Sequence, residues 1–272
     1  MTSPPRMTDA TALTLHRARA SDDALFLHQA AADEIEDRLK VVKKSFTDAA
    51  IVSGFPGLWS TRFTNTAQVP ADDTLALHAA SLDLVIHAMA LHWANDPIGQ
   101  LIQCRRALRP DGLFLAVGYG GQTLHELRAC LAEAETAITG GLSPRVAPMA
   151  ELRDMGGLLQ RAGYALPVAD AMTLNVTYRD LWHLMHDLRA MGENNALHQR
   201  LRQPTARSVF DRAAALYRDN FTDGADRINA TFELIFLTGW APHESQPRPL
   251  RPGSAKQRLS DALNTGETKL PI

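Results

Sequence analysis

The chain has few cysteines, no long hydrophobic run and no excess of charge of either sign. No stretch approaches the ~18 to 20 consecutive apolar residues of a membrane-spanning helix. The formal net charge is -2, so there is no basic field to attract nucleic acid. The two cysteines, Cys104 and Cys130, show no CxxC spacing, which argues against structural zinc. We therefore predict no membrane span, no nucleic-acid partner and no metal site.

The beginning of the sequence lacks the apolar core of a secretory signal. Together with the low cysteine content, which suits a reducing compartment, this predicts a cytoplasmic protein. The first residues are rich in Ser, Thr and Arg but include Asp9, so a mitochondrial transit peptide, and with it the matrix, is the less favoured alternative. We expect residues 1–24 to form a flexible N-terminus.

What the sequence does contain is a succession of short apolar strands and amphipathic helices. Apolar residues recur every three or four positions over residues 25–42, which predicts a helix. A second helix is expected from Asn95 or Asp96 to Leu108, followed by a turn at 109–112. Buried strands are predicted from apolar runs at residues 49–53, 82–88 and 113–117. The last two strands flank the second helix, so they form a βαβ unit with parallel pairing.

The second half of the chain adds more helices and two strands. The same periodicity predicts helices at 123–139, 150–162, 178–191 and 205–220, and strands at 168–176 and 228–238. We predict an α/β fold with a mostly parallel sheet, an antiparallel edge strand and added C-terminal helices. The expected organisation is one domain over 25–240, with a helical insertion at about 178–220, and a Pro/Arg-rich tail over 241–272.

Several segments carry a family resemblance. The order of strand, glycine turn, helix, strand, helix, RPDG turn and strand resembles the class I S-adenosylmethionine-dependent methyltransferases, whose fold is Rossmann-like. The segments SLDLVIHAMALHWANDP, GGQTLHELR, DLRAMGENNAL and WAPHESQPRPLRPGSA are similar to the complex I assembly factors of that superfamily, whose mitochondrial member is an arginine hydroxylase. The resemblance implies S-adenosylmethionine as cofactor. It also implies a protein substrate or client, such as a complex I subunit.

The front third departs from the family's pattern. In that fold the first strand ends in an acidic residue followed by GxGxG, because only glycine lets the backbone approach the cofactor closely. Here the run Ser53-Gly54-Phe55-Pro56-Gly57 keeps two glycines and has no acid before them. Only 23 residues separate Gly57 from Ser81, too few for two crossovers. We therefore predict that one βα unit is missing and that the cofactor site is degenerate.

The resemblance still indicates candidate cofactor ligands. Asp72 and Asp73 align with the acidic residue that contacts adenine in the family. The glycine turn would cradle one end of the cofactor at the start of the next helix. An ordinary strand-to-helix turn explains the same glycines. The candidates are Ser53, Gly54, Gly57, Asp72, Asp73 and Ala88.

Four residues are candidates for the substrate side. His92 and Trp93 follow the strand at 82–88, where this fold faces its substrate, although packing of a loop on the end of the sheet is the alternative. His243 and Glu244 lie in the tail and would serve acid-base chemistry or close over a partner, unless the tail merely docks on the body. The sequence identifies no catalytic residue.

These features leave three functions open. The leading hypothesis is an S-adenosylmethionine-dependent enzyme that modifies a protein side chain during assembly of respiratory complex I. A catalytically inactive assembly chaperone that no longer binds cofactor is the first alternative, and the shortened front third supports it. A small-molecule or carrier-protein methyltransferase is the second.

Overall fold

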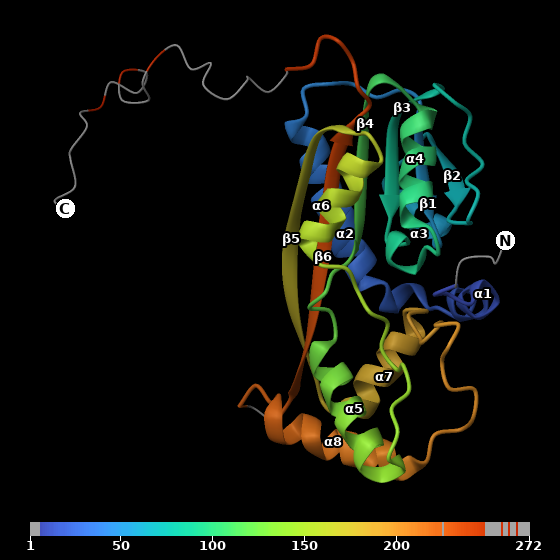
Figure 1. The fold of residues 1–272 in the computed structure, drawn as a ribbon, viewed down its shortest axis with the longest axis vertical. Helices are drawn as coiled ribbons and strands as arrows, with labels where there is room; N and C mark the ends of the chain where they lie inside the picture. The colour runs from blue at the N-terminus through green and yellow to red at the C-terminus, as the bar shows by residue number, and fades with distance from the viewer. Residues whose placement is uncertain (1–5, 225, 248–256, 258–260, 262–264, 266–272) are drawn as a thin grey trace. The chain divides into compact units, whose positions relative to one another are not determined.

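The computed structural model describes residues 6–224 and 226–247, together with the single residues 257, 261 and 265. The chain divides into two compact units, Met1–Pro242 and His243–Ile272. Most of the predicted tail over 241–272 lies outside the described residues. The first unit contains the sheet and every helix labelled in Figure 1.

The centre of the first unit is a six-stranded sheet in the order β2-β1-β3-β4-β6-β5. Strands β1 to β4 are parallel, and β6 runs antiparallel to both of its neighbours, β4 and β5. The strands are β1 (Ala49–Ser53), β2 (Thr66–Pro70), β3 (Leu82–Ala88), β4 (Leu108–Tyr119), β5 (Ala165–Tyr178) and β6 (Ile228–Trp240). This arrangement confirms the predicted fold class, a mostly parallel α/β sheet with antiparallel strands at one edge.

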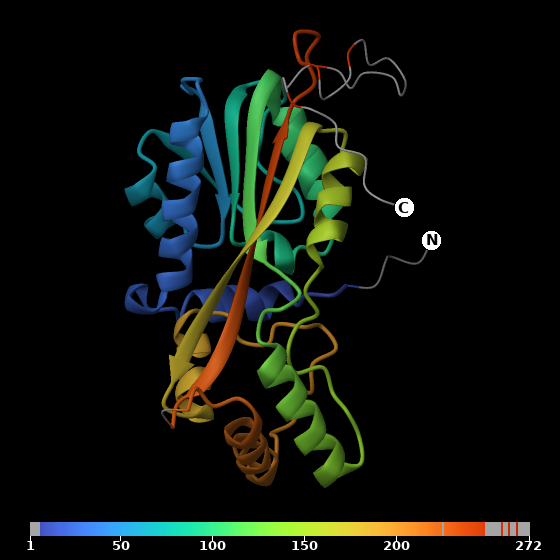
Figure 2. The same ribbon diagram turned by 90° about the vertical axis from the view of Figure 1, so that its left-hand side faces the viewer.

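Helices cover both faces of the sheet because successive strand residues point to opposite sides. On one face, α2 (Phe26–Val41) and α3 (Pro56–Arg62) pack on Ile51, Ile86 and Leu115. On the other face, α4 (Pro97–Ala107) and α6 (Leu152–Arg161) pack on Val52, Val85 and Phe114. Figure 2 shows the two helical layers on either side of the strands.

Three further helices gather around the far halves of β5 and β6 (Figure 1). They are α5 (His125–Thr139), α7 (Leu181–Ala190) and α8 (Arg207–Asn220). Leu127, Leu184 and Leu216 from these helices join the same apolar core as Phe232 of β6. Two of the three, α7 and α8, lie within the stretch expected to be a helical insertion.

The front of the sheet is short, as the residue count requires. Between Gly57 and β3 the chain forms only the rest of α3 and the strand β2, and residues 71–81 return to the sheet without a helix. Strand β2 was not predicted. Only Val69 of its five residues is buried, so this edge strand lacks the apolar pattern by which strands are recognised.

The helix near the N-terminus was not predicted. We expected residues 1–24 to be flexible, but α1 (Ala10–Arg17) is a helix whose first turn is capped by the Asp9 carboxylate, which accepts from the Ala12 N–H. The N–H groups of Thr8 and Asp9 donate to Asn95 and to Ala196. A helix of eight residues shows too short a pattern to be recognised from sequence. It crosses the carboxyl ends of the parallel strands (Figure 2).

Candidate functional site

Two hollows lie at the carboxyl ends of the parallel strands. The first, which we call the glycine-turn pocket, has a volume of about 640 Å³ and is walled by α1, the turn after β1 and the end of β2. The second, the aromatic cavity, has about 60 Å³ and is bounded by the loop after β3, the end of β4, α5 and the segment after α7. Ligands of open α/β sheets bind at this edge.

The glycine-turn pocket contains three of the six candidate cofactor residues. Ser53, Gly54 and Asp72 line it. Gly57 lies in α3, where nothing comes within 4 Å of the position a Cβ would take. Asp73 and Ala88 are not among the lining residues, and Ala88 is fully buried at the end of β3. Of the two predicted acidic residues, only Asp72 therefore lies in the same pocket as the glycine turn.

Arg17 is the feature of this pocket that the sequence did not reveal. Its guanidinium lies against Gly54 so closely that a Cβ there would overlap Nη1. Its Nε and Nη2 are buried and have no hydrogen-bond partner. Burial lowers the pKa of Arg17, while the negative charge of Glu193 acts in the opposite direction. The result is a buried cation with free donors, seated where only glycine leaves room.

Asp72 reaches the same pocket because two glutamines of α4 hold the connection that follows β2. Gln100 Nε2 donates to the Asp72 carbonyl at 2.9 Å, and Gln103 accepts from the Leu75 N–H at 2.8 Å. The other end of the Gln100 amide lies 2.8 Å from His87 Nε2. Burial lowers the pKa of His87 to about 4, so the ring is neutral at pH 7 and donates to the amide oxygen. These hydrogen bonds fix the backbone at Asp72, whose side chain is exposed.

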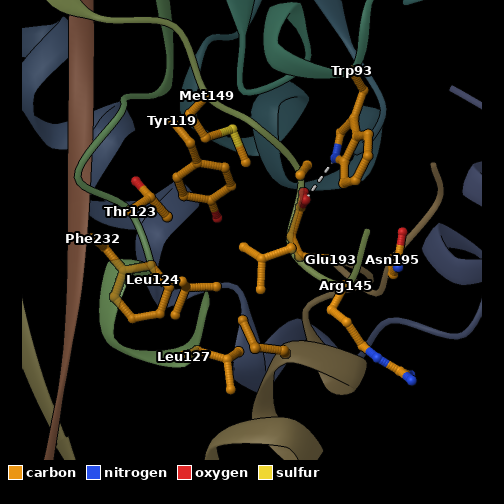
Figure 3. Close-up of a pocket in the computed structure, with 13 residues that line it drawn as sticks. Trp93, Tyr119, Thr123, Leu124, Leu127, Arg145, Met149, Glu193, Asn195 and Phe232 are labelled. Carbon is orange, nitrogen blue, oxygen red and sulfur yellow. Dashed lines mark hydrogen bonds between the residues drawn. The ribbon is translucent and has the colours of Figure 1, made fainter. Parts of the chain in front are cut away.

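Aromatic and apolar side chains line most of the aromatic cavity (Figure 3). Trp93, Tyr119, Leu124, Leu127, Met149 and Phe232 form its walls, with Glu193 and Arg145 on one side. Of the predicted substrate-facing residues, Trp93 lines the cavity. His92 packs beside it, with its ring 4.7 Å from that of Tyr119. Burial raises the pKa of Tyr119 well above its ordinary value, so the phenol keeps its proton.

Glu193 is the second candidate residue that the sequence did not reveal. Its side chain is only 6% exposed. The Trp93 indole N–H donates to its Oε2 at 2.7 Å, and His92 Nε2 lies 3.5 Å from the same atom. Burial alone would raise the pKa of the carboxyl, but His92, the charge of Arg17 and the Trp93 N–H outweigh it and lower the pKa to about 2. The carboxylate is therefore charged at pH 7.

The tail candidates belong to the second unit. His243 Nδ1 lies 2.7 Å from Ser245 Oγ, and the His243 N–H donates to Gln246 Oε1. Glu244 is exposed. Their substrate-facing role remains a prediction. Among the residues that the structure describes, no group of His, Cys, Asp and Glu is arranged to hold a metal ion, and no helix is long and apolar enough to cross a membrane.

Comparisons with known proteins show which families the chain resembles. A family model described as a methyltransferase domain matches residues 31–116. The chain is 42% identical over 186 residues to the mitochondrial arginine-hydroxylase NDUFAF5 of Dictyostelium discoideum, covering 68% of this chain and 42% of the relative. For the human protein of that name the identity is 39% over 191 residues, covering 70% and 55%.

Two further matches are to proteins that are not named NDUFAF5. The malonyl-[acyl-carrier protein] O-methyltransferase of Methylovorus sp. (strain MP688) is 31% identical over 263 residues, covering 96% of this chain and 84% of the relative. Among solved structures, a putative methyltransferase from Bacillus halodurans C-125 aligns at a TM-score of 0.47 and 12% identity, covering 76% of this chain and 97% of that one.

The chain therefore belongs to the class I S-adenosylmethionine-dependent methyltransferase superfamily. Within it, the chain is related to the proteins named arginine-hydroxylase NDUFAF5, of whose length it matches 42 to 66% in the first relatives found. These relatives are named as mitochondrial, which contradicts the predicted cytoplasmic location. Composition could not separate the two compartments, because both are aqueous and reducing.

Proposed function

We propose that this protein binds S-adenosylmethionine in the glycine-turn pocket and modifies a side chain of a protein client during assembly of respiratory complex I. The observation that carries the proposal is the guanidinium of Arg17 against Gly54, whose Nε and Nη2 are buried without a hydrogen-bond partner. The names of the relatives, arginine-hydroxylase and methyltransferase, support the kind of chemistry. The chain matches about half the length of the first relatives, so their activity is a hypothesis for this protein.

The residues present fit the cofactor. The guanidinium of Arg17, which lines the pocket, would bind the carboxylate of its methionine part in a charge-assisted contact. Asp72, beyond the end of the strand next to β1, would accept from the ribose hydroxyls. The volume of about 640 Å³ lies within the range of small-molecule sites. Gly57, Asp73 and Ala88 have no direct contact in this proposal.

When bound, S-adenosylmethionine would supply an electrophilic methyl group for a nucleophile of the substrate, which would lose its proton to water. This chain's residues supply orientation and exclude water, which together account for much of the rate of such transfers. Trp93 and His92 would position the incoming side chain at the end of β3. Hydroxylation, the activity named in the relatives, needs in addition an oxidant that supplies oxygen.

The carrier-protein alternative is supported by the match to a malonyl-[acyl-carrier protein] O-methyltransferase but meets an electrostatic obstacle. A malonyl group ends in a carboxylate, and the charged Glu193 on the wall of the aromatic cavity would repel it. The chaperone alternative keeps the fold and client surface but no cofactor. Direct measurement of cofactor binding distinguishes the chaperone hypothesis from the enzyme hypothesis.

Isothermal titration with S-adenosylmethionine tests the cofactor site. We expect a micromolar Kd for the unmodified protein, and affinities lower by about ten-fold or more for Arg17→Met and Asp72→Asn, because each loses a charged hydrogen bond. Arg17→Lys, which keeps the charge, should recover part of the loss. Asp73→Asn should change the affinity less than about two-fold, because Asp73 does not line the pocket. Millimolar or absent binding to the unmodified protein would leave only the chaperone.

A pair of glycine variants tests whether the turn seats Arg17. In Gly54→Ala the new methyl group meets the end of the flexible Arg17 side chain, so the guanidinium should move away. The affinity for S-adenosylmethionine should then fall by about ten-fold, with less than about 1 kcal/mol lost in the free energy of unfolding. Gly57→Ala adds its methyl group to open space in α3 and should leave the affinity unchanged. Equal affinities for the two variants would contradict the role given to Arg17.

Mass spectrometry of a complex I subunit incubated with the protein and cofactor tests the client. A gain of one methylene on a side chain supports methyl transfer, and a gain of one oxygen supports hydroxylation. Retained binding of the subunit with no mass change supports the chaperone.

A further inference from the structure

A third hollow lies where α7 meets α8, and we call it the α7–α8 hollow. It has a volume of about 420 Å³ and is lined by Trp182 of α7, Arg207 and Phe210 of α8, and Thr205. None of these four described residues lines the glycine-turn pocket or the aromatic cavity. The rings of Trp182 and Phe210 lie with their centroids 5.8 Å apart, so one side of the hollow is an aromatic wall.

The hollow brings a tryptophan and an arginine together at the surface. Trp59 and Trp93 are buried, whereas Trp182 is exposed. The Arg207 guanidinium lies 5.9 Å from the Trp182 ring centroid, and its side chain is 85% exposed. Tryptophan and arginine are the side chains that most often dominate the binding energy of protein interfaces. The composition of this wall is therefore typical of a site that contacts another protein.

Two polar groups of the wall can donate to a ligand. The ion pair of Arg207 with Asp211 is 3.8 Å long, and because both side chains are exposed it contributes little. The Thr205 hydroxyl oxygen accepts from Arg145 Nη1 at 2.6 Å, which leaves its own proton to donate. A guanidinium and a hydroxyl side by side favour a negatively charged acceptor such as a carboxylate.

The surroundings of the hollow have the same sign. Helix α7, which is described throughout, exposes no acidic side chain, and its exposed residues are Trp182, His183, His186 and Arg189. Asp187 is half-buried and accepts from the Tyr178 hydroxyl at 2.7 Å. Asp180 pairs with Arg179 and caps α7. An acidic ligand is therefore complementary to this surface, and arginine-lined sites for acidic motifs are a recurring mode of peptide recognition.

The hollow is joined to the aromatic cavity by one side chain. Arg145 lines that cavity, and the same guanidinium holds Thr205 of the hollow. A protein bound at the hollow is thus held next to the cavity. A concave site also fits one side chain better than it fits the flat surface of a bilayer.

We propose that the α7–α8 hollow is a docking site for an acidic segment of a protein partner. A glutamate of that segment places its carboxylate against Arg207 and Thr205. Its methylene groups pack on the rings of Trp182 and Phe210. The inference goes beyond the proposed function, because it concerns a separate surface and requires no cofactor.

Fluorescence anisotropy with the full chain and two labelled peptides tests the proposal. The first peptide is Gly-Glu-Glu-Leu-Glu-Glu-Gly, and the second has glutamine in place of every glutamate. Glutamine keeps the shape without the charge, so the second should bind at least about ten-fold more weakly. The affinity for the first should fall as salt is added, because the contact is exposed. Equal affinities for the two peptides would overturn the proposal, and this comparison needs no variant.

Three variants assign the contact to the hollow. Arg207→Gln and Trp182→Ala should each weaken binding of the glutamate peptide by about five-fold or more, because one loses the charge and the other the apolar wall. Arg212→Gln removes the same charge from an exposed position of α8 that does not line the hollow, and should change the affinity less than about two-fold. Equal losses in the two arginine variants would show attraction to overall charge and contradict a defined site.

Two further measurements separate this proposal from its rivals. Sedimentation with vesicles of phosphatidylcholine and phosphatidylglycerol tests a membrane surface as the occupant. Vesicle binding that depends on Arg207, with no binding of the glutamate peptide, would overturn the protein partner. Titration of Arg207→Gln with S-adenosylmethionine should give an affinity within about two-fold of the unmodified protein, because Arg207 does not line the glycine-turn pocket. Selective peptide binding without any cofactor binding would support the docking site and refute the enzyme.

Discussion

Replacing Trp59 by alanine should lower the free energy of unfolding by about 3 to 5 kcal/mol, the usual loss for a large aromatic side chain removed from a core. Trp59 of α3 is fully buried and stacks on Phe63 with ring centroids 5.8 Å apart. Its indole N–H donates to His28 Nδ1 at 3.3 Å. The variant would leave a cavity, and a buried histidine acceptor would lose its donor.

The effect should extend to the candidate site. Burial lowers the pKa of His28 to about 4, so the ring is neutral, and it packs on Phe55 at 4.6 Å. Phe55 in turn lies beneath the Arg17 guanidinium, 5.8 Å from its ring centroid. We therefore expect Trp59→Ala to weaken binding of S-adenosylmethionine as well as stability.

Urea unfolding followed by circular dichroism measures the stability change. Trp182→Ala is the matched control, since this tryptophan is 36% exposed on α7 and should cost less than about 1 kcal/mol. Similar losses in both variants would show that the α3 side of the core is not packed as described.

The second large effect is expected for Glu135→Gln, with a loss of about 3 kcal/mol. The Glu135 side chain is 5% exposed. It accepts from the backbone and hydroxyl of Ser143 and from two nitrogens of Arg145. Removing its charge leaves the Arg145 guanidinium, itself only 15% exposed, without its counter-charge. The segment tied down in this way continues into Val146 and Ala147 of the aromatic cavity, which should loosen too.

The same carboxylate predicts a pH dependence. The hydrogen bonds from Arg145 outweigh burial and lower the pKa of Glu135 from 4.5 to about 2. Because the folded-state pKa is depressed, the stabilisation is fully present above pH 4.5 and is lost as the pH falls toward 2. Glu193, whose pKa is also about 2, acts in the same window.

Unfolding measured at neutral pH and at falling pH down to about 3 checks this prediction. The unmodified protein should lose more stability over that window than Glu135→Gln, which has no carboxyl left to titrate at this position. Glu133→Gln, on the exposed side of the same helix, should follow the unmodified protein. Parallel curves for all three would contradict the lowered pKa of Glu135.

Two short elements show why the secondary structure predicted from the sequence was incomplete. Strand β2 has a single buried residue, and α1 buries only Ala12 and Leu13, so neither has the apolar period that prediction requires. Both become part of a pocket wall only because the sheet places the end of β2 beside Ser53 and because α1 crosses the same edge. Arg17, at the end of α1, was missed for the same reason.

The sequence by itself determined the α/β class, the parallel core strands and the shortened front, because apolar periodicity and residue count act locally and leave few alternatives. It also carried the family resemblance. The tertiary structure decided which of the sequence's candidates come together and added Arg17 and Glu193 to them. Arg17 meets Gly54 across 37 positions, and Trp93 meets Glu193 across 100, so the charge and burial of these side chains depend on contacts that no local pattern encodes.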